Sequence, residues 1–391
     1  CQANTGIQRV VRMIAKAGRG RLKPLVYDPY LTGWRHLDNR EECNLYLNDN
    51  SKPGQQRRAD WTWGQKCKGI YRKLTNQAYK SIDKTDDLAV GVAPCLLIPE
   101  PFGVEQSAIY FSFRERNHAR LVALFHDAVA VKFPETCSPE SVRSARDYLR
   151  GLAAFDCVIS VSESSQNDLL ACWDEMRVAA PPRCVVLHHG THWTHHKSPP
   201  SGDISQFYPS PTRLLRVLSV GTIEARKNHD ALLEACRHLW DNDLPFELDI
   251  VGGYNKKTGS RTVQKIKALS AEGYPIRHWK IVSDTFLEKM YKECDLLAYP
   301  SLYEGFGLPI VEALAFGKPV LTTPYGSLPE VCSQGGCLQI PDGTSESIEK
   351  GLQSFIEDPE LRCRLMNEAY RYHPKPWGDY VDELFMLIKS L

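Results

Sequence analysis

The 391-residue sequence lacks several features that would place it in a special class of protein. It has no uninterrupted apolar run of about 18 residues, so no membrane-spanning helix is expected. Its 13 cysteines include no CxxC pair, which argues against a zinc site or a disulfide scaffold and favours reduced thiols in a cytoplasmic protein. The first residues, Cys1 to Asn4, do not read as a signal peptide. A globular protein of two or three domains is therefore expected.

The sequence also has little overall charge, with a formal net charge of only +1. Its charged residues are, however, unevenly distributed along the chain. Residues 1–80 hold 16 Lys and Arg against 6 Asp and Glu, a net +10, which leaves −9 for the rest. The basic residues concentrate in 9–23 and 57–74. A solvated basic face explains them; the alternative is a surface that meets anionic lipid or an anionic acceptor at the inner face of a membrane. No recognition motif accompanies the charge, so nucleic acid is not expected as a partner.

Short apolar segments alternate with helical patterns through most of the chain, which predicts βαβ units and parallel sheets covered on both faces. In the second half the expected strands are 213–221, 246–253, 276–282, 294–300 and 318–323, and the expected helices are 228–240, 261–271, 285–293 and one from Pro309. In the first half the expected strands are 121–127, 157–163 and 183–190, and the expected helices are 139–154 and 163–172.

Two irregular stretches interrupt this pattern. Residues 198–212, rich in Pro, Ser and Gly, predict a linker between two α/β domains. Residues 31–68 have little periodicity and predict a long insertion or loop. After two prolines, residues 373–391 turn helical with an apolar stripe that includes Tyr380 and Leu384. The predicted domains are 1–205, 206–373 and a C-terminal helix over 374–391.

The most informative stretch is SLYEGFGLPIVEALAFGKPV, residues 301–320. Pro309 suits the first turn of a helix, and the glycines before it let backbone come close to a ligand. The amides at a helix N-terminus favour anions, and the carboxylates of Glu304 and Glu312 are good acceptors for vicinal hydroxyls. Both acids are therefore expected to face one ligand such as a ribose or a hexose. Simple capping of the helix N-terminus is the alternative.

Three further clusters follow predicted strands. In SVGTIEARKNHD (219–230), the adjacent cations Arg226 and Lys227 could clamp a diphosphate or be a solvated pair. In LVALFHDAVAVKFPE (121–135), His126 and Asp127 end an apolar strand, where ligands of open α/β sheets bind, or they play a structural part. Serine capping explains SVSESSQNDL (160–169).

Taken together, these motifs resemble the retaining family 4 glycosyltransferases. Glu304 and Glu312 match the family's E-x7-E signature, VGTIEARKNH its phosphate-binding loop, and LFHDAVAVKFPE its strand with His-Asp. SVSESSQNDL is similar to its N-domain strand-helix step, and NTGIQRVVR (4–12) to its first glycine loop and helix. The resemblance implies the α/β GT-B fold, in which two Rossmann-like domains with parallel sheets face each other across a cleft. The N-terminal domain would bind the acceptor and the C-terminal domain the nucleotide sugar.

The resemblance also implies roles for single residues. The catalytic residues would be His126, Asp127 and Glu304. The donor-binding residues would be Gly6, Gly221, Thr222, Arg226, Lys227, Gly305, Phe306, Gly307, Leu308 and Glu312. Within that set, Glu312 would bind the ribose, Arg226 and Lys227 the leaving diphosphate, and Glu304 the donor sugar. The final helix would cross back to the N-terminal domain. The family has a strand before its glycine loop, whereas Cys1 precedes Gly6 by only five residues, so this sequence is either a fragment of a longer chain or lacks that strand.

The function implied is transfer of a sugar from a nucleotide sugar to a hydroxyl of a carbohydrate or lipid-linked acceptor, with the anomeric configuration kept. No metal or other cofactor is expected. Polysaccharide or glycolipid assembly is the expected setting. The alternatives are a nucleotide-sugar epimerase or hydrolase of the same fold, and a non-catalytic module that binds sugar nucleotides.

Overall fold

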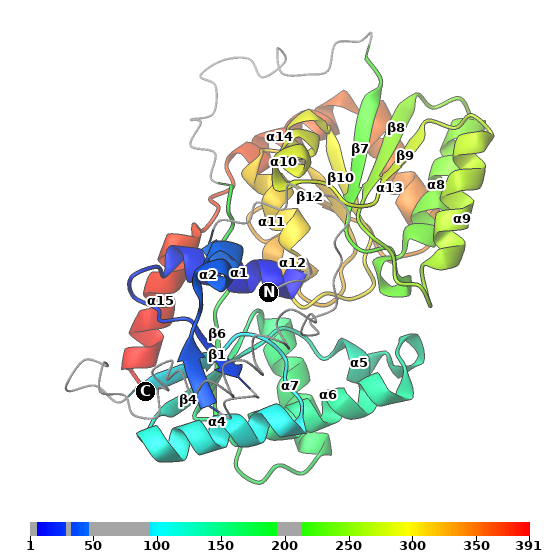
Figure 1. The fold of residues 1–391 in the computed structure, drawn as a ribbon. Coiled ribbons are helices and arrows are strands. Elements are labelled where there is room, and N and C mark those ends of the chain that lie inside the picture. The colour runs from blue at the N-terminus through cyan, green and yellow to red at the C-terminus, as the bar shows by residue number, and fades with distance from the viewer. Residues whose placement is uncertain (1–5, 29–32, 47–93, 194–212) are drawn as a thin grey trace.

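The computed structural model describes residues 6–28, 33–46, 94–193 and 213–391. The described chain forms two parallel sheets, each covered by helices, which are stacked one above the other in Figure 1. The change from one sheet to the other falls between Val186 and Leu215, and the predicted linker, residues 198–212, lies outside the described residues.

The second sheet has six strands in the order β12-β11-β10-β7-β8-β9, all parallel. Its strands are β7 (Leu215–Val220), β8 (Phe246–Val251), β9 (Ile276–Trp279), β10 (Leu296–Tyr299), β11 (Val320–Thr322) and β12 (Cys337–Gln339). Its helices are α8 (His229–Asp241), α9 (Ser260–Ala271), α10 (Asp284–Glu293), α11 (Leu308–Ala315), α12 (Leu328–Val331), α13 (Ser345–Glu357) and α14 (Pro359–Tyr370). This is the doubly wound order, and the strand order reverses between β7 and β10.

The first sheet has four described strands, parallel, in the order β3-β4-β5-β6. They are β3 (Cys95–Ile98), β4 (Arg120–Phe125), β5 (Cys157–Ser160) and β6 (Arg183–Val186). Between them run α4 (Val104–Asn117), the short α5 (Val129–Lys132), α6 (Pro139–Leu152) and α7 (Glu163–Glu175). β4 and β5 are buried almost throughout, which is why their sequences read as continuous apolar runs.

The expectation of a loop over residues 31–68 is wrong for its described part. β1 (Leu25–Asp28) pairs antiparallel with β2 (Gly33–His36), and α2 (Asn39–Tyr46) follows. The guanidinium of Arg35 is buried between the carboxylates of Asp28 and Glu41, at 3.1 and 2.7 Å. This segment has no apolar periodicity that would predict its strands. Ion pairs, as well as apolar packing, stabilise the hairpin. Residues 47–68 lie outside the described part of the chain.

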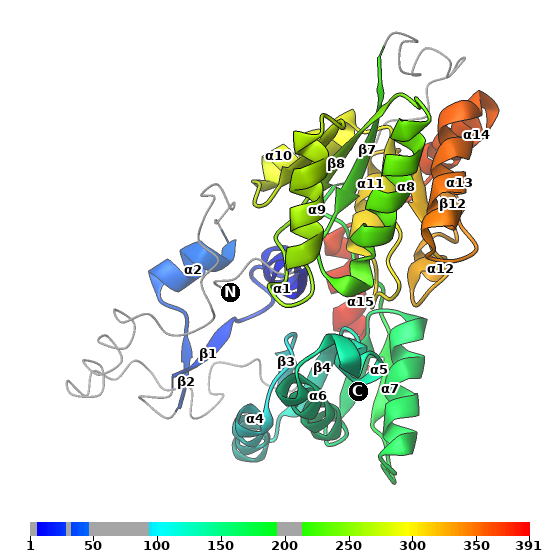
Figure 2. The same cartoon turned by 90° about the vertical axis from the view of Figure 1, so that its right-hand side faces the viewer.

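The two ends of the described chain share one core. α1 (Gly6–Ala17) lies between the two sheets in both views, and α15 (Trp377–Lys389) runs beside it (Figures 1 and 2). Val10 and Ile14 of α1 pack with Tyr380 and Leu384 of α15 and with Ile159 of β5. Trp377 closes against Gly190, and Thr191 N–H donates to the Lys375 carbonyl. The last helix thus packs on the first sheet.

No helix within the described ranges is both long and apolar enough to cross a bilayer. The cysteines in those ranges are free thiols; Cys43 is exposed, and the others are buried or half-buried.

Because α15 completes the core of the first sheet, Leu384→Ala should destabilise the protein by about 3 kcal/mol through lost burial and a residual cavity. Met386 on the same helix is 64% exposed, so Met386→Ala should change stability by no more than about 0.5 kcal/mol. Urea denaturation followed by circular dichroism measures both. Equal effects from the two variants would contradict the packing described for α15.

Candidate active site

The carboxyl ends of the strands of both sheets meet at one place. From the second sheet, the loop after β7 brings Arg226 and Lys227, and the loop after β10 brings Glu304. From the first sheet, His126 follows β4 and Ser162 follows β5. β7 and β10 are the pair at which the strand order reverses, and ligands of doubly wound sheets bind outside such a pair.

Arg226, Lys227 and Glu304 form one ion cluster. Arg226 donates through Nη1 to Glu304 Oε2 at 2.8 Å, and Lys227 Nζ donates to Glu304 Oε1. Lys227 also donates to the Tyr299 hydroxyl at 2.5 Å, and Arg226 Nε pairs with Glu224 at 2.7 Å. Two cations and two carboxylates balance, so the cluster carries no net charge without a ligand.

Burial shapes the protonation of this cluster. Desolvation opposes ionisation of Glu304, but the charges of Lys227 and Arg226 lower its pKa to about 2. Burial lowers the pKa of Lys227, while the charge of Glu304 acts in the opposite direction. Glu304 is therefore a carboxylate at any physiological pH, and a weak base.

The loop after β7 begins with Gly221 and Thr222. Gly221 N–H donates to the Val251 carbonyl, and Thr222 is exposed at the carboxyl edge of the sheet. A 3-10 turn over Ala225–Lys227 then sends Lys227 inward and leads into α8. A Cβ built on Gly221 would lie 3.5 Å from Lys227 Cε, so this glycine is next to one of the two cations. The assignment of Gly221 and Thr222 to donor binding stays a prediction.

Gly305 contacts the other domain rather than open space. A Cβ on Gly305 would lie 2.0 Å from the His126 carbonyl oxygen and 3.0 Å from Asp127 Cβ. The end of β4 therefore occupies the space that a side chain at this position would need. The donor-binding role of Gly305 stays a prediction. The Gly305 carbonyl accepts from the hydroxyl of Ser162 at 2.7 Å and lies 3.0 Å from that of Ser165.

The next residues extend this contact between the domains. The Phe306 ring packs on His188 and His189, with centroids 5.8 and 5.1 Å away. Gly307 is the N-cap of α11 with φ +97°, a conformation that favours glycine. Leu308 is half-buried and packs against the cores of both sheets.

His126 is buried and neutral. Burial lowers its pKa, and a hydrogen bond to the Pro99 carbonyl, 2.8 Å from Nε2, opposes the shift. Because that partner is an acceptor, Nε2 holds the proton, and Nδ1 remains an acceptor. Asp127 is half-buried, accepts from Val129 N–H at 3.2 Å and stands next to Gly305. The two residues therefore flank the Glu304 loop.

Glu312 does not share the ion cluster of Glu304 in this structure. That both acids contact one ligand stays a prediction. Glu312 is buried in α11, pairs with Arg9 of α1 at 2.7 Å and accepts from the Tyr291 hydroxyl at 2.8 Å. Burial raises its pKa, although Arg9 and Tyr291 act in the opposite direction. The turn at Gly307 and one turn of helix direct Glu312 toward α10 and α1.

Arg9 is a site residue that the sequence reasoning missed. It lies one turn after Gly6 in NTGIQRVVR, and only the glycine was assigned a role. Gly6 is exposed at the first position of α1, with nothing within 4 Å of a Cβ built there. Arg9 instead joins α1 to α11 through Glu312 and stacks 4.8 Å over Trp193. The only signal in the sequence that could have identified Arg9 is its position three residues after Gly6, about one helical turn along.

Two side chains of the second domain bind α7 or its neighbours directly. Glu330 accepts from the Glu163 and Ser164 amides at the N-terminus of α7, at 2.8 and 2.7 Å, and pairs with His188 at 3.3 Å. Tyr303 donates to Asp168 at 2.6 Å. Ser162 caps α7 as predicted, and the same helix end also binds the second domain.

Potential metal ligands do not cluster within the described ranges, where no group of three His, Cys, Asp or Glu side chains could hold an ion. One Asp-x-Asp tripeptide occurs, Asp241-Asn242-Asp243, at the far end of α8 from Lys227. There Asp241 accepts from the Tyr274 hydroxyl at 2.5 Å.

Glu304→Gln should destabilise the protein by about 3 kcal/mol at pH 7, because it leaves two buried cations short of a partner. The folded pKa of Glu304 lies below its unfolded value, so its contribution is complete above about pH 4.5 and is lost as the pH falls toward 2. Urea titrations at pH 7, 5 and 3 should show the gap between wild type and variant closing. Glu357→Gln, at an exposed position of α13, is the control; a pH-independent gap for Glu304→Gln would contradict the ion cluster.

The chain is similar to proteins that act on sugars. Residues 202–372 match the family model described as glycosyl transferases group 1. The O-antigen chain mannosyltransferase B of Escherichia coli is 29% identical over 258 residues, 61% of this chain and 62% of that protein. The serotype-specific mannosyltransferase WbdA of Escherichia coli is 36% identical over 40% of this chain but only 20% of its own length. The mannosylfructose-phosphate synthase of Agrobacterium fabrum matches over 52% of its length at 26% identity. The chain thus spans less than two thirds of these relatives.

Solved structures with the same fold cover most or all of the chain. HepE of Anabaena, solved with UDP and glucose, has a TM-score of 0.65 at 16% identity and covers 100% of this chain and 98% of its own. Sucrose-phosphate synthase of Thermosynechococcus elongatus has a TM-score of 0.60 at 18% identity and covers 84% and 77%. Residues 202–372 are therefore similar to the group 1 glycosyl transferases, and the two parallel sheets of the chain form the GT-B fold.

Proposed function

We propose that this protein is a retaining glycosyltransferase that moves a sugar from a nucleotide-sugar donor to a hydroxyl group of a glycan. One observation carries the proposal: Arg226, Lys227 and Glu304 gather at the switch point of the second sheet, against the His126 end of the first. HepE was solved with UDP and glucose, which supports a nucleotide donor. The mannosyltransferases among the relatives favour mannose as the sugar and a growing polysaccharide or glycolipid as the acceptor.

Donor binding would change the partners in the ion cluster. A diphosphate brings about two negative charges to a cluster that is neutral without it. Glu304 must therefore lose some of its hydrogen bonds with the two cations. Arg226 is the more exposed of the two and would reach the diphosphate first, with its guanidinium fork. Glu304 would then accept from hydroxyl groups of the donor sugar.

The same groups would stabilise the leaving group. Negative charge builds on the diphosphate in the transition state, and preorganised cations near it stabilise that charge more than they stabilise the donor. Arg226, Lys227 and the amides at the start of α11 would do this without a metal ion. Neutral His126 would orient the sugar through the acceptor atom Nδ1, and Gly6 and Glu312 would contact the nucleotide from α1 and α11.

Front-face displacement is the mechanism that fits these groups best. With a pKa of about 2 and two cations as partners, Glu304 is a poor nucleophile and a poor base. The leaving phosphate oxygen would accept the proton of the attacking hydroxyl, and the new bond would form on the face that the phosphate leaves. A glycosyl adduct trapped on Glu304 or Asp127 would contradict this mechanism.

Contact with a membrane remains a prediction. The basic segment 57–74 lies outside the described residues. Part of the segment 9–23 is not available for it, because Arg9 pairs with Glu312 and Arg12 is buried.

Incubation with a panel of UDP- and GDP-sugars and thermal unfolding measurements should identify the donor. A donor at 100 times its dissociation constant should add roughly 2.7 kcal/mol of stability. Product analysis then separates the functions: transfer requires an acceptor and keeps the anomeric configuration, a hydrolase or epimerase changes the donor alone, and a binding module leaves it intact. Turnover that needs no acceptor, or inversion at the anomeric carbon, would contradict the proposal.

Glu304→Gln should separate binding of the leaving group from transfer of the sugar. Without the Glu304 charge both cations are open to the diphosphate, so the free nucleoside diphosphate should bind about tenfold tighter, a change on the order of 1 to 2 kcal/mol. The rate of transfer should fall by at least two orders of magnitude. Calorimetry and a transfer assay measure the two effects, with Glu357→Gln as the control. Weaker diphosphate binding in Glu304→Gln would show that the cations are not the diphosphate site.

A further inference from the structure

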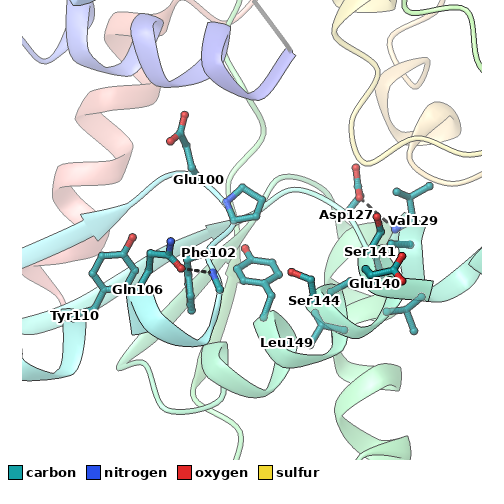
Figure 3. Close-up of a pocket in the computed structure, with 17 residues that line it drawn as sticks. Glu100, Phe102, Gln106, Tyr110, Asp127, Val129, Glu140, Ser141, Ser144 and Leu149 are labelled. Carbon is teal, nitrogen blue, oxygen red and sulfur yellow. Dashed lines mark hydrogen bonds between the residues drawn. The ribbon is translucent and has the colours of Figure 1, made fainter. Parts of the chain in front are cut away.

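The first domain contains a cavity of about 750 Å³ at the carboxyl ends of β3 and β4. Its walls come from the segment after β3, from α4, from the β4–α5 segment and from α6 (Figure 3). A volume of this size suits a small organic ligand such as one or two sugar rings. We call it the acidic cavity, after Glu100, Asp127 and Glu140 in its lining.

The acidic cavity adjoins the candidate active site through Asp127. That residue lines the cavity, follows His126 and has its Cβ 3.0 Å from a Cβ built on Gly305. In Figure 3, Glu100 and Asp127 both point to the side on which α1 and the second domain lie. A ligand in the cavity would therefore present its end to the cleft where the donor sugar is proposed to lie.

The charges of the lining have one sign. Among the described residues that line the cavity, the charged side chains are the three carboxylates, and none is Lys, Arg or His. Two cations outside the lining act on its carboxylates. The charge of Arg226 interacts with that of Asp127. The charge of Lys257, after a backbone hydrogen bond and Ser138, helps to lower the pKa of Glu140, but neither cation lines the cavity.

The uncharged lining completes a surface that suits hydroxyl groups. Gln106, Ser141 and Ser144 offer donors and acceptors, while the rings of Phe102 and Tyr148 offer apolar faces. Glu100 Oε1 is shielded from solvent and accepts no hydrogen bond from the described part of the chain. A buried acceptor without a partner is costly, and a ligand hydroxyl would satisfy it.

We propose that the acidic cavity binds the acceptor as an uncharged sugar residue, and that its carboxylates exclude a phosphate group near the accepting hydroxyl. The proposal rests on the proposed transferase function and names the acceptor class. Carboxylates accept hydrogen bonds from hydroxyl groups but repel phosphate, and at short range in a partly buried site that repulsion is large. If the acceptor is carried on a lipid phosphate, that phosphate lies outside the cavity.

Saturation-transfer NMR with the intact protein tests the cavity directly. The probes are methyl α-mannoside, methyl α-glucoside and the corresponding sugar 6-phosphates. At least one methyl glycoside should bind in the millimolar range, and its phosphate should bind at least tenfold more weakly. A phosphate that binds as well as its neutral counterpart, or no binding of any neutral sugar, would overturn the proposal.

Reversing one charge in the lining should reverse the preference of the cavity for neutral sugars over sugar phosphates. Glu140→Lys should weaken binding of the neutral sugar and strengthen binding of the sugar phosphate by at least fivefold. Glu135→Lys, at an exposed position outside the cavity, should change the binding of neither. Equal effects from the two variants would show that the effect is not local to the cavity. Glu100→Gln should raise the KM for the acceptor and leave nucleoside diphosphate binding unchanged.

Donor binding is measured separately by thermal unfolding with the sugar-nucleotide panel. If a donor binds but the cavity prefers phosphates, the acceptor class is wrong and the transferase function stands. If no donor binds, the transferase function fails, and neutral sugar binding in the cavity no longer identifies an acceptor.

Discussion

One buried carboxylate between two cations holds the centre of this protein together. Glu304 joins Arg226 to Lys227, and with them the loop after β10 to the loop after β7. None of the three could be buried alone without a large desolvation cost. The ion cluster therefore fixes the position of both loops at the reversal of strand order.

Hydrogen bonds from side chains of one domain to backbone groups of the other help to hold the two domains together. The Gly305 carbonyl is bound by serine hydroxyls at the start of α7, and the Gly305 Cα has no space for a side chain beside the His126 carbonyl. Glu330 adds a carboxylate to the N-terminus of the same helix, where the amides are unpaired within the helix and the dipole favours an anion. The loop that carries Glu304 thus also helps to hold the two domains together.

The sequence predicted five of the six strands of the second sheet, because these strands are short apolar runs separated by amphipathic helices, but β12 was not predicted. The clusters at the strand ends were also predictable, since parallel strands bring their carboxyl ends to one edge. The partners within those clusters were not. Spacing in the chain says nothing of the left-handed turn at Gly307, which sends Glu312 to Arg9 instead of toward Glu304. The buried Arg35 was missed for the same reason, because ion pairs leave no periodic pattern.

The place of α15 has a consequence for how the protein is made. Its Tyr380 and Leu384 fill the core beneath the first sheet, yet they leave the ribosome after every strand of the second sheet. During synthesis, part of the apolar surface of the first domain therefore stays uncovered until the second domain has been completed. Chaperones that shield nascent chains would find their binding surface there, on the early half of the polypeptide.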